Sequence, residues 1–384
     1  MQIFPGLPND LGRKCLLRVS YESHPNLKAV CRRWEATLNG PHFYEDRKKL
    51  GTSQQCICLF ELRPSETEEF DEEYVVTVYN PLQGTWEPLP PFPHFPGVHY
   101  RGIPIDCACI SLNQKLLLIG GRVPSPFPSD GNVLSYGRVV NTVFIYNFLT
   151  AQWSRGAGMP TVRMGGAVSL SPEGLVYIPG GNGSDLNALR RAEVYSVEED
   201  EWRILPDMGQ DMDNCFGAFN DGKLFVFDDM TNEDLHLPPV GLSAEVYDPN
   251  RGAWTTIPEE EAPPVLNCEI ASTHGPRFFS VEESGVMEYD SKENVWRAVC
   301  SIPERLATTN GTISFCVVWR DMLFVGGVGP DGETLFYMWK PPPIQSEEGA
   351  QGETFGKWYA VEKPQHFHVD YVHNLDMFAV TVEI

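Results

Sequence analysis

The sequence predicts an all-β propeller of six blades that follows a small helical domain, and three observations lead to this prediction. Apolar residues recur at three- and four-residue steps through residues 1–50, which is typical of short amphipathic helices. From about residue 56 the pattern changes to short apolar or alternating strands between Gly, Pro and Asp turns. A tyrosine is then followed seven positions later by a tryptophan, five times. We therefore expect a helical domain at 1–50 and a β-propeller at 56–384.

The helical region is expected to contain three helices. The first two lie on either side of a break at 23–26, and the third is expected at 43–50. Three such helices bury little surface by themselves, so an exposed apolar face is expected to dock on another protein. The apolar positions of the first two helices are Leu11, Cys15, Leu16 and Val19, then Leu27, Val30, Cys31, Trp34 and Leu38.

The repeated aromatic pairs define the blades. A turn separates the two aromatics of each pair, so the tyrosine ends one strand and the tryptophan begins the next. Each unit is then a four-stranded antiparallel sheet of roughly fifty residues, which is the size of a propeller blade. The pairs are Tyr79 and Trp86, Tyr146 and Trp153, Tyr195 and Trp202, Tyr247 and Trp254, and Tyr289 and Trp296.

An apolar strand that runs into a glycine pair marks three of the units. These strands end at Gly121, Gly181 and Gly327, where two glycines allow a tight turn beside a neighbouring blade. The fourth unit has Val-Phe-Asp-Asp at 226–229 instead, and the fifth has Ser-Val-Glu-Glu at 280–283. Both units keep their aromatic pairs, so we expect the same blade count with a different turn in these two blades.

The sixth unit and the closure of the ring need residues from the end of the chain. The sixth unit contains Tyr337, and its tryptophan is expected to be Trp358, displaced by a Pro- and Glu-rich insertion at 341–357. The first unit has only three strands before residue 90, whereas the apolar segment 377–384 belongs to no other unit. We predict that this segment supplies the inner strand of the first blade. Whether 366–372 also pairs there is left open.

The charge and the cysteine content of the chain limit which binding partners and which cellular compartment we expect. The formal net charge is −23, whereas residues 1–50 carry nine Lys/Arg against five Asp/Glu. An acidic body repels phosphates, so neither nucleic acid nor a membrane is an expected partner, although solubility alone explains this charge equally well.

Without an apolar run of eighteen residues or a signal-peptide pattern, the chain is expected in the cytoplasm and nucleus. The pairs Cys56 and Cys58, and Cys107 and Cys109, are expected to be core thiols.

Two sets of motifs resemble a known family. Leu-Pro-Asn-Asp at 7–10, Val-Cys-Arg-Arg-Trp at 30–34 and Phe-Tyr at 43–44 are similar to an F-box, and the glycine pairs with their Tyr and Trp resemble kelch repeats. Together they resemble the plant F-box/kelch-repeat proteins, notably the KISS ME DEADLY group. The resemblance implies a substrate-recognition subunit of an SCF-type E3 ubiquitin ligase, partnered by a Skp adaptor and a cullin scaffold, that directs a protein substrate to ubiquitination and proteasomal degradation.

The resemblance also places an adaptor-facing surface in the helices. We expect about half of its apolar residues to pack the helices together and the rest to contact the adaptor, with Arg13, Arg18, Arg32 and Arg33 as a basic rim. The residues carried over are Leu7, Pro8, Leu11, Cys15, Leu16, Val19, Val30, Cys31 and Trp34.

The substrate surface is expected on one face of the propeller. Loops that join the second strand to the third, and loops that join one blade to the next, emerge on the same face. Aromatic residues and arginines dominate binding hot spots, and arginines in acidic loops are suited to hold a carboxylate. The candidates are Phe95, His99, Tyr100, Arg101, Phe127, Tyr136, Arg163, Arg190, Arg191 and Arg305.

Enzymatic alternatives find little support in the sequence. The nine histidines form no ring of ligands across blades, and no catalytic motif occurs. The nearest metal-like run is Asp228, Asn232 and His236, in which an amide stands where a carboxylate is needed. We expect no metal, no cofactor and no catalytic residue.

A kelch scaffold that promotes no degradation remains an alternative to the ligase subunit. Relatives in the resembled group are associated with phenylalanine ammonia-lyase and other phenylpropanoid enzymes, and with type-B cytokinin response regulators.

Overall fold

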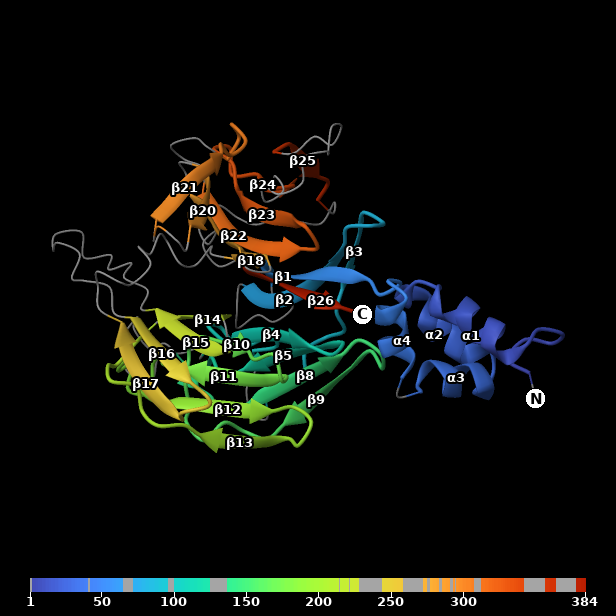
Figure 1. The fold of residues 1–384 in the computed structure, drawn as a ribbon, viewed down its shortest axis with the longest axis horizontal. Helices are drawn as coiled ribbons and strands as arrows, with labels where there is room; N and C mark the ends of the chain where they lie inside the picture. The colour runs from blue at the N-terminus through green and yellow to red at the C-terminus, as the bar shows by residue number, and fades with distance from the viewer. Residues whose placement is uncertain are drawn as a thin grey trace.

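The protein consists of a helical N-terminal domain at one end of a six-bladed propeller (Figure 1), which confirms the predicted fold class. The computed structural model describes residues 2–40, 42–64, 72–95, 100–124, 137–213, 215–220, 222–227, 244–257, 272–274, 277–282, 285–290, 293, 295–306, 312–341, 356–363 and 378–384. The helices lie on the right of Figure 1, with the strands running roughly toward and away from them.

Four α-helices and one 3-10 turn make up the helical domain, one helix more than expected. The predicted second helix is interrupted at Cys31, whose backbone is extended (φ −164°, ψ 157°). This corner redirects the chain so that Trp34 packs on Phe4, with ring centroids 4.8 Å apart. A continuous helix was therefore wrong at this point. The elements are α1 (Asn9–Leu17), η1 (Tyr21–Ser23), α2 (His24–Val30), α3 (Arg32–Leu38) and α4 (Phe43–Lys49).

Each blade is an antiparallel sheet of four strands, counted from the propeller axis outward. Blade 2 also carries a short ribbon, β6 (Arg122–Val123) with β7 (Arg138–Val139). Blade 1 contains β26 (Phe378–Glu383), β1 (Gln55–Pro64), β2 (Glu72–Asn80) and β3 (Thr85–Pro88). Blade 2 contains β4 (Ala108–Leu112), β5 (Lys115–Ile119), β8 (Val143–Asn147) and β9 (Gln152–Gly156). Blade 3 contains β10 (Ser169–Leu170), β11 (Leu175–Pro179), β12 (Ala192–Ser196) and β13 (Glu201–Ile204).

The other three blades have the same strand order. Blade 4 contains β14 (Phe216–Asn220), β15 (Lys223–Phe227), β16 (Ala244–Asp248) and β17 (Ala253–Ile257). Blade 5 contains β18 (Ser272–His274), β19 (Arg277–Glu282), β20 (Gly285–Asp290) and β21 (Val295–Cys300). Blade 6 contains β22 (Thr312–Trp319), β23 (Met322–Val328), β24 (Thr334–Trp339) and β25 (Trp358–Val361). Blades 4 and 5 thus form without a glycine pair.

The ring closes inside blade 1, as the leftover apolar segment predicted. The last strand, β26, pairs antiparallel with β1, from Gln55 opposite Glu383 to Phe60 opposite Phe378. The Phe60 and Phe378 rings stack at 4.1 Å. Val382 and Ile384 are each only 1% exposed, so the end of this strand is part of the core. The segment 366–372 lies outside the described residues.

A repeated hydrogen bond joins neighbouring blades. The indole N–H of Trp202 donates to the carbonyl of Ala157, which lies four residues after the tryptophan of the preceding blade. The same bond is made by Trp86, Trp153 and Trp254, to Glu362, Pro90 and Pro206 respectively. Trp358 donates to the Ser301 carbonyl, which lies five residues after Trp296 of the preceding blade. Trp358 is therefore the tryptophan of blade 6 despite the insertion before it. These five indoles each fasten their blade to the preceding one.

Two of the three glycine pairs behave as the sequence predicts. Gly121 and Gly181 have φ of 86° and 84°, and a Cβ at either position would lie within about 2.6 Å of the backbone of an inter-blade loop. Blade 6 is different, because Gly326 and Gly327 stay inside strand β23 and the chain does not turn there. A Cβ on Gly326 would collide with the ring of Phe315, so this pair provides space for an aromatic side chain instead of a turn.

Strand direction separates the two ends of the propeller. Strand β1 begins, and β2 ends, beside the helices, and the turns after Asn80 and Asn147 lie there as well. We call this end the helix face. The second-to-third-strand loops and the inter-blade loops emerge at the opposite end, which we call the distal face. It includes the loops 182–191 and 205–213.

Candidate functional site

The helical domain presents five of the nine predicted adaptor residues to solvent. Val30 is 60% exposed and Leu11 is 44% exposed, which is unusual for large apolar side chains. Pro8, Cys15 and Cys31 are also exposed, whereas Leu7, Val19 and Trp34 are half-buried. Leu16 is 1% exposed and packs in the core with Leu17, Leu38, Phe43 and Tyr44. Of the nine residues, Leu16 alone is fully buried, and contact of the exposed residues with an adaptor stays a prediction.

Buried polar contacts hold the helices in place. His24 is 3% exposed, and its ring nitrogens lie 3.0 Å from the Tyr44 hydroxyl and 3.2 Å from the Val19 carbonyl. Burial, and after it the charge of Arg47, lowers the pKa of His24 to about 4. The imidazole is therefore neutral at physiological pH. With the proton on Nε2, it donates to Val19 and accepts from Tyr44.

The predicted basic rim is partly engaged within the domain. Arg13 forms an ion pair with Asp46 at 2.6 Å, and the pKa of Asp46 is lowered by this hydrogen bond. Arg18 is exposed and donates to the carbonyl of Lys14, one turn earlier. Arg32 is exposed, and Arg33 is half-buried beside Asn9. The exposed apolar residues of α1 and α2 thus lie on a helical surface that also carries cationic groups.

Hydrogen bonds attach this domain to blades 1 and 2. The backbone of Gln54 pairs with that of Ile384 in both directions, at 2.8 and 2.7 Å. Lys28 donates to the Leu149 carbonyl in the turn between β8 and β9, and Lys48 forms an ion pair with Glu383. The linker between helices and propeller therefore continues into the sheet that closes the ring.

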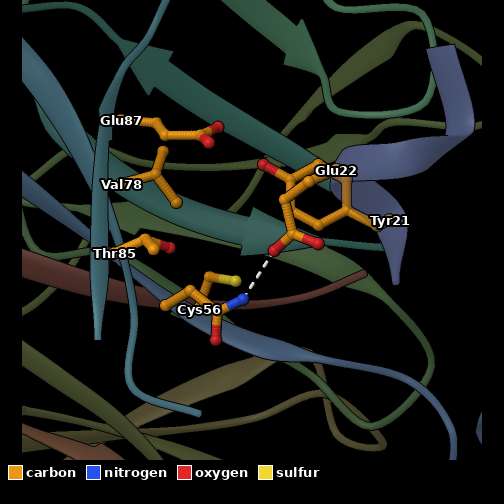
Figure 2. Close-up of a pocket in the computed structure, with 7 residues that line it drawn as sticks. Tyr21, Glu22, Cys56, Val78, Thr85 and Glu87 are labelled. Carbon is orange, nitrogen blue, oxygen red and sulfur yellow. Dashed lines mark hydrogen bonds between the residues drawn. The ribbon is translucent and has the colours of Figure 1, made fainter. Parts of the chain in front are cut away.

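A small pocket lies at this junction (Figure 2). The side-chain amide of Asn80 donates a hydrogen bond to the Glu22 carboxylate, and Figure 2 shows this carboxylate pointing into the pocket. Burial, and after it the charge of Glu22, raises the pKa of the Cys56 thiol to about 12. This thiol is thus protonated and unreactive at neutral pH. The pocket is lined by Tyr21, Glu22, Cys56, Val78, Asn80, Thr85 and Glu87.

Three of the predicted substrate-binding residues are buried and cannot act as surface contacts. Arg163 is 2% exposed and forms an ion pair with Glu193, which is itself fully buried. It also donates to the carbonyls of Gly180 and Arg191. Arg163 therefore ties an inter-blade loop to blade 3, and its assignment to the substrate surface was wrong.

Two aromatic candidates for the substrate surface, Phe95 and Tyr100, are also buried, so their assignment to that surface was wrong. Phe95 is 3% exposed and packs edge-on against Phe144, with centroids 5.3 Å apart. Tyr100 is 2% exposed, and its hydroxyl donates to the Ile103 carbonyl and accepts from the Tyr74 amide. Both residues fill the space between blades 1 and 2. His99, Phe127 and Tyr136 lie outside the described residues.

The remaining arginine candidates lie on the distal face. Arg190 makes two hydrogen bonds to Asp211, at 2.9 and 2.8 Å, and Arg191 lies 3.6 Å from Asp207. Arg305 lies between Glu333 and Asp331, and its hydrogen bond to Glu333 lowers the pKa of that carboxyl. These guanidinium groups are about half exposed and already paired. Arg101 is exposed at the edge of the same face.

Two features of this face were not predicted from the sequence. Glu193 lies two residues before Tyr195, and Glu245 lies two residues before Tyr247, so a buried glutamate repeats in blades 3 and 4. Glu245 accepts hydrogen bonds from the amides of Gly209 and Gln210. The glutamate two residues before the tyrosine, repeated in two blades, was the sequence signal that could have identified these buried carboxylates. The second feature, Leu186, is exposed at the tip of a distal loop.

The described residues offer no grouping of three or more His, Cys, Asp or Glu able to hold a metal ion. Asp228, Asn232 and His236 lie outside them. Among the helices described, none is long and apolar enough to cross a membrane.

The fold and the exposed helical surface define a propeller-based interaction protein with a helical docking domain. Known families match both parts: the F-box domain at residues 4–46, and the kelch motif at 105–160 and 163–209. Three Arabidopsis thaliana proteins are similar along the chain. F-box/kelch-repeat protein At1g80440 is 32% identical, over 68% of this chain and 70% of the relative. F-box/kelch-repeat protein SKIP20 is 29% identical, over 95% and 94%. F-box/kelch-repeat protein At1g15670 is 27% identical, over 88% and 92%.

The chain belongs to the F-box/kelch-repeat family, and the plant resemblance is thereby confirmed. Membership indicates the general role of a substrate-recognition adaptor in an SCF-type complex, with the F-box toward a Skp adaptor and the kelch repeats toward a substrate.

Proposed function

We propose that this chain is a non-catalytic receptor subunit of an SCF-type E3 ubiquitin ligase, which brings a target protein to a ubiquitin-conjugating enzyme held by the cullin scaffold. Such a subunit needs no chemistry of its own, because holding a target lysine near the conjugating enzyme raises its effective concentration.

The observation that carries the proposal is the arrangement of two surfaces on one body. The exposed apolar residues Leu11 and Val30 belong to helices at the helix face, and the distal loops emerge at the other end of the strands. The hydrogen-bonded junction at Gln54 and Ile384 links the two parts. A target on the distal face would therefore be held at a set distance from the adaptor.

The test uses the full chain and its Leu11→Asp/Val30→Asp variant. Proximity labelling under proteasome inhibition, with the wild-type chain as bait, identifies the neighbouring proteins. The half-life of the most enriched protein outside the SCF complex is then measured with each form. We expect the variant to lose the Skp adaptor, keep the labelled protein and lengthen its half-life. An unchanged half-life would favour the alternative, a kelch scaffold that promotes no degradation.

Two target classes follow from the resemblance to the KISS ME DEADLY group, namely phenylalanine ammonia-lyase with related phenylpropanoid enzymes, and type-B cytokinin response regulators. We propose them as the first proteins to assay with the purified chain. Direct binding measured with one class and not the other would choose between them.

A further inference from the structure

The loop between β11 and β12 of blade 3 presents a leucine in a backbone conformation that leucine disfavours. Leu186 has φ of 62° and is 43% exposed. A bulky side chain is strained at positive φ, where glycine is not. Among the non-glycine residues with positive φ in the described ranges, Leu186 alone has a large apolar side chain.

Blade 6 contains the same loop with glycine at this position. In blade 3 the Gly183 amide donates to the Asn187 carbonyl, and the Leu186 amide donates to the Gly183 carbonyl, both at 3.0 Å. In blade 6 the Gly329 amide donates to Glu333, and the Gly332 amide to Gly329, at 2.8 and 3.0 Å.

An aspartate occupies the same place in both loops and accepts a backbone hydrogen bond two residues later. In blade 3 Asn187 donates to Asp185, and in blade 6 Glu333 donates to Asp331. Gly332 has φ of 77° at the position that corresponds to Leu186. The two loops therefore share one backbone, and the leucine is not required to build it.

The strained leucine is held firmly. The Asn182 side-chain amide donates to the Leu186 carbonyl at 3.2 Å, and the Asn187 side-chain amide donates to Asp185 at 2.7 Å. The base of the loop pairs with the next inter-blade loop, where Leu189 forms a β-bridge with Met212. The side chain of Leu186 is thus presented to solvent on a rigid support, which lowers the entropy lost on binding.

We propose that Leu186 is the apolar anchor by which the distal face captures its protein partner, and that the partner carries an apolar pocket with a basic rim. Strain maintained at an exposed residue is typical of binding sites, and a buried apolar anchor within a polar rim is typical of protein interfaces. The inference rests on the proposed function for the identity of the partner as a ligase target.

The charges around Leu186 favour a basic rim on the partner. Arg190 and Arg191 are matched by Asp211 and Asp207. Asp185 and Asp213 are then surplus acidic groups of these two loops, within the part of the chain that the structure describes. The whole chain has a net charge of −23, so its long-range field has the same sign.

Three substitutions separate the side chain from the backbone. Leu186→Gly reproduces the blade 6 loop, Leu186→Ala keeps a Cβ at the strained position, and Leu186→Met keeps a long apolar side chain. Leu82→Ala is the matched control, because Leu82 is 52% exposed but lies in the turn after β2, on the helix face. Because glycine relieves the strain, Leu186→Gly should melt at or above the wild-type temperature.

The binding test uses the purified full chain and the most enriched labelled protein, studied by isothermal titration calorimetry. We expect Leu186→Gly and Leu186→Ala to weaken binding tenfold or more, and Leu186→Met and Leu82→Ala to stay within about threefold. Wild-type affinity in both the Gly and Ala variants would overturn the inference. Leu186-dependent binding to a protein whose half-life ignores Leu11→Asp/Val30→Asp would sustain the anchor and reject the ligase function.

Discussion

The guanidinium group of Arg163 donates to the carboxylate of Glu193 in the interior of the propeller, where neither side chain is more than 2% exposed. Arg163 lies in the loop that enters blade 3, and Glu193 lies on the third strand of that blade. Thr161 donates to the same carboxylate. An inter-blade loop is therefore fastened by a charged network that water does not reach.

Removing one partner of this pair should be costly. Arg163→Ala leaves the Glu193 carboxylate buried and uncompensated, which typically destabilises a protein by about 3–5 kcal/mol. Thermal and urea unfolding of the full chain measure this loss. Arg163→Met combined with Glu193→Met should recover most of the stability, because no charge then stays buried. The half-exposed pair of Arg305 and Glu333 offers a control, since Arg305→Ala should leave the melting temperature nearly unchanged.

The inter-blade indole bonds should contribute equally in regular and irregular blades. Trp202→Phe and Trp358→Phe each remove one N–H donor while keeping an aromatic ring, and each should cost about 1 kcal/mol. Equilibrium urea unfolding measures both losses, provided that the slope of the free energy of unfolding against urea concentration is the same in each variant. Equal losses would show that Trp358 serves blade 6 as Trp202 serves blade 3. A silent Trp358→Phe would mean that its bond to Ser301 contributes nothing to stability.

The helical surface should divide into residues for folding and residues for docking. Leu16→Ala opens a cavity beside Phe43 and Leu38 and should destabilise the helical domain by about 2–5 kcal/mol. Val30→Asp changes an exposed side chain and should leave the melting temperature almost unchanged. It should nevertheless weaken binding of the Skp adaptor tenfold or more in a pull-down titration. Equal adaptor affinity for Val30→Asp and the wild type would remove α2 from the docking surface.

Mild acid should destabilise the helical domain through His24. Its pKa is about 4 in the folded protein, against an ordinary value of 6.5, because burial disfavours the charged ring. The unfolded chain therefore binds more protons between these two values, so stability is complete above pH 6.5 and declines as pH falls toward 4. Unfolding of wild type and His24→Gln from pH 7.5 to 4 measures this slope. The variant should be less stable at neutral pH and show a flatter profile.

Closure by β26 should be essential for cooperative folding. Deleting 377–384 leaves β1 without its inner partner and removes the buried side chains of Val382 and Ile384. We expect loss of the sharp thermal transition and binding of a hydrophobic dye. Glu383→Ala keeps the strand and removes only the bonds to Lys48 and Ser53, so it should still melt cooperatively. A deletion that melts like the wild type would contradict this closure.

The propeller was predictable because its signal is repeated and local. A fixed spacing between Tyr and Trp indicates a strand, a turn and a second strand, and the number of times that it recurs indicates the number of blades. The leftover strand in blade 1 followed from counting. The corner at Cys31 was not predictable, because tertiary packing of Trp34 on Phe4 overrides the helical pattern of α2 and α3.

The distal site was harder to predict, because residue type does not report burial. Arg163, Phe95 and Tyr100 belong to loops, yet each is turned inward by a partner far along the chain. Nothing about a leucine at position 186 indicates a binding site from the sequence alone. Its positive φ, at a position where the equivalent loop of blade 6 has Gly332, is what distinguishes it from other exposed leucines. Repeat comparison finds such positions once the loops can be superimposed.

The pairing of β26 with β1 sets an order of events during synthesis. The helices leave the ribosome before the strands of the propeller, whereas the strand Phe378–Glu383 emerges after every other described strand. A chain that stops before residue 378 therefore carries all its docking helices on an open ring. Such a fragment would occupy adaptors without a finished platform for a target, so premature termination late in the chain would yield a competitor of the intact receptor.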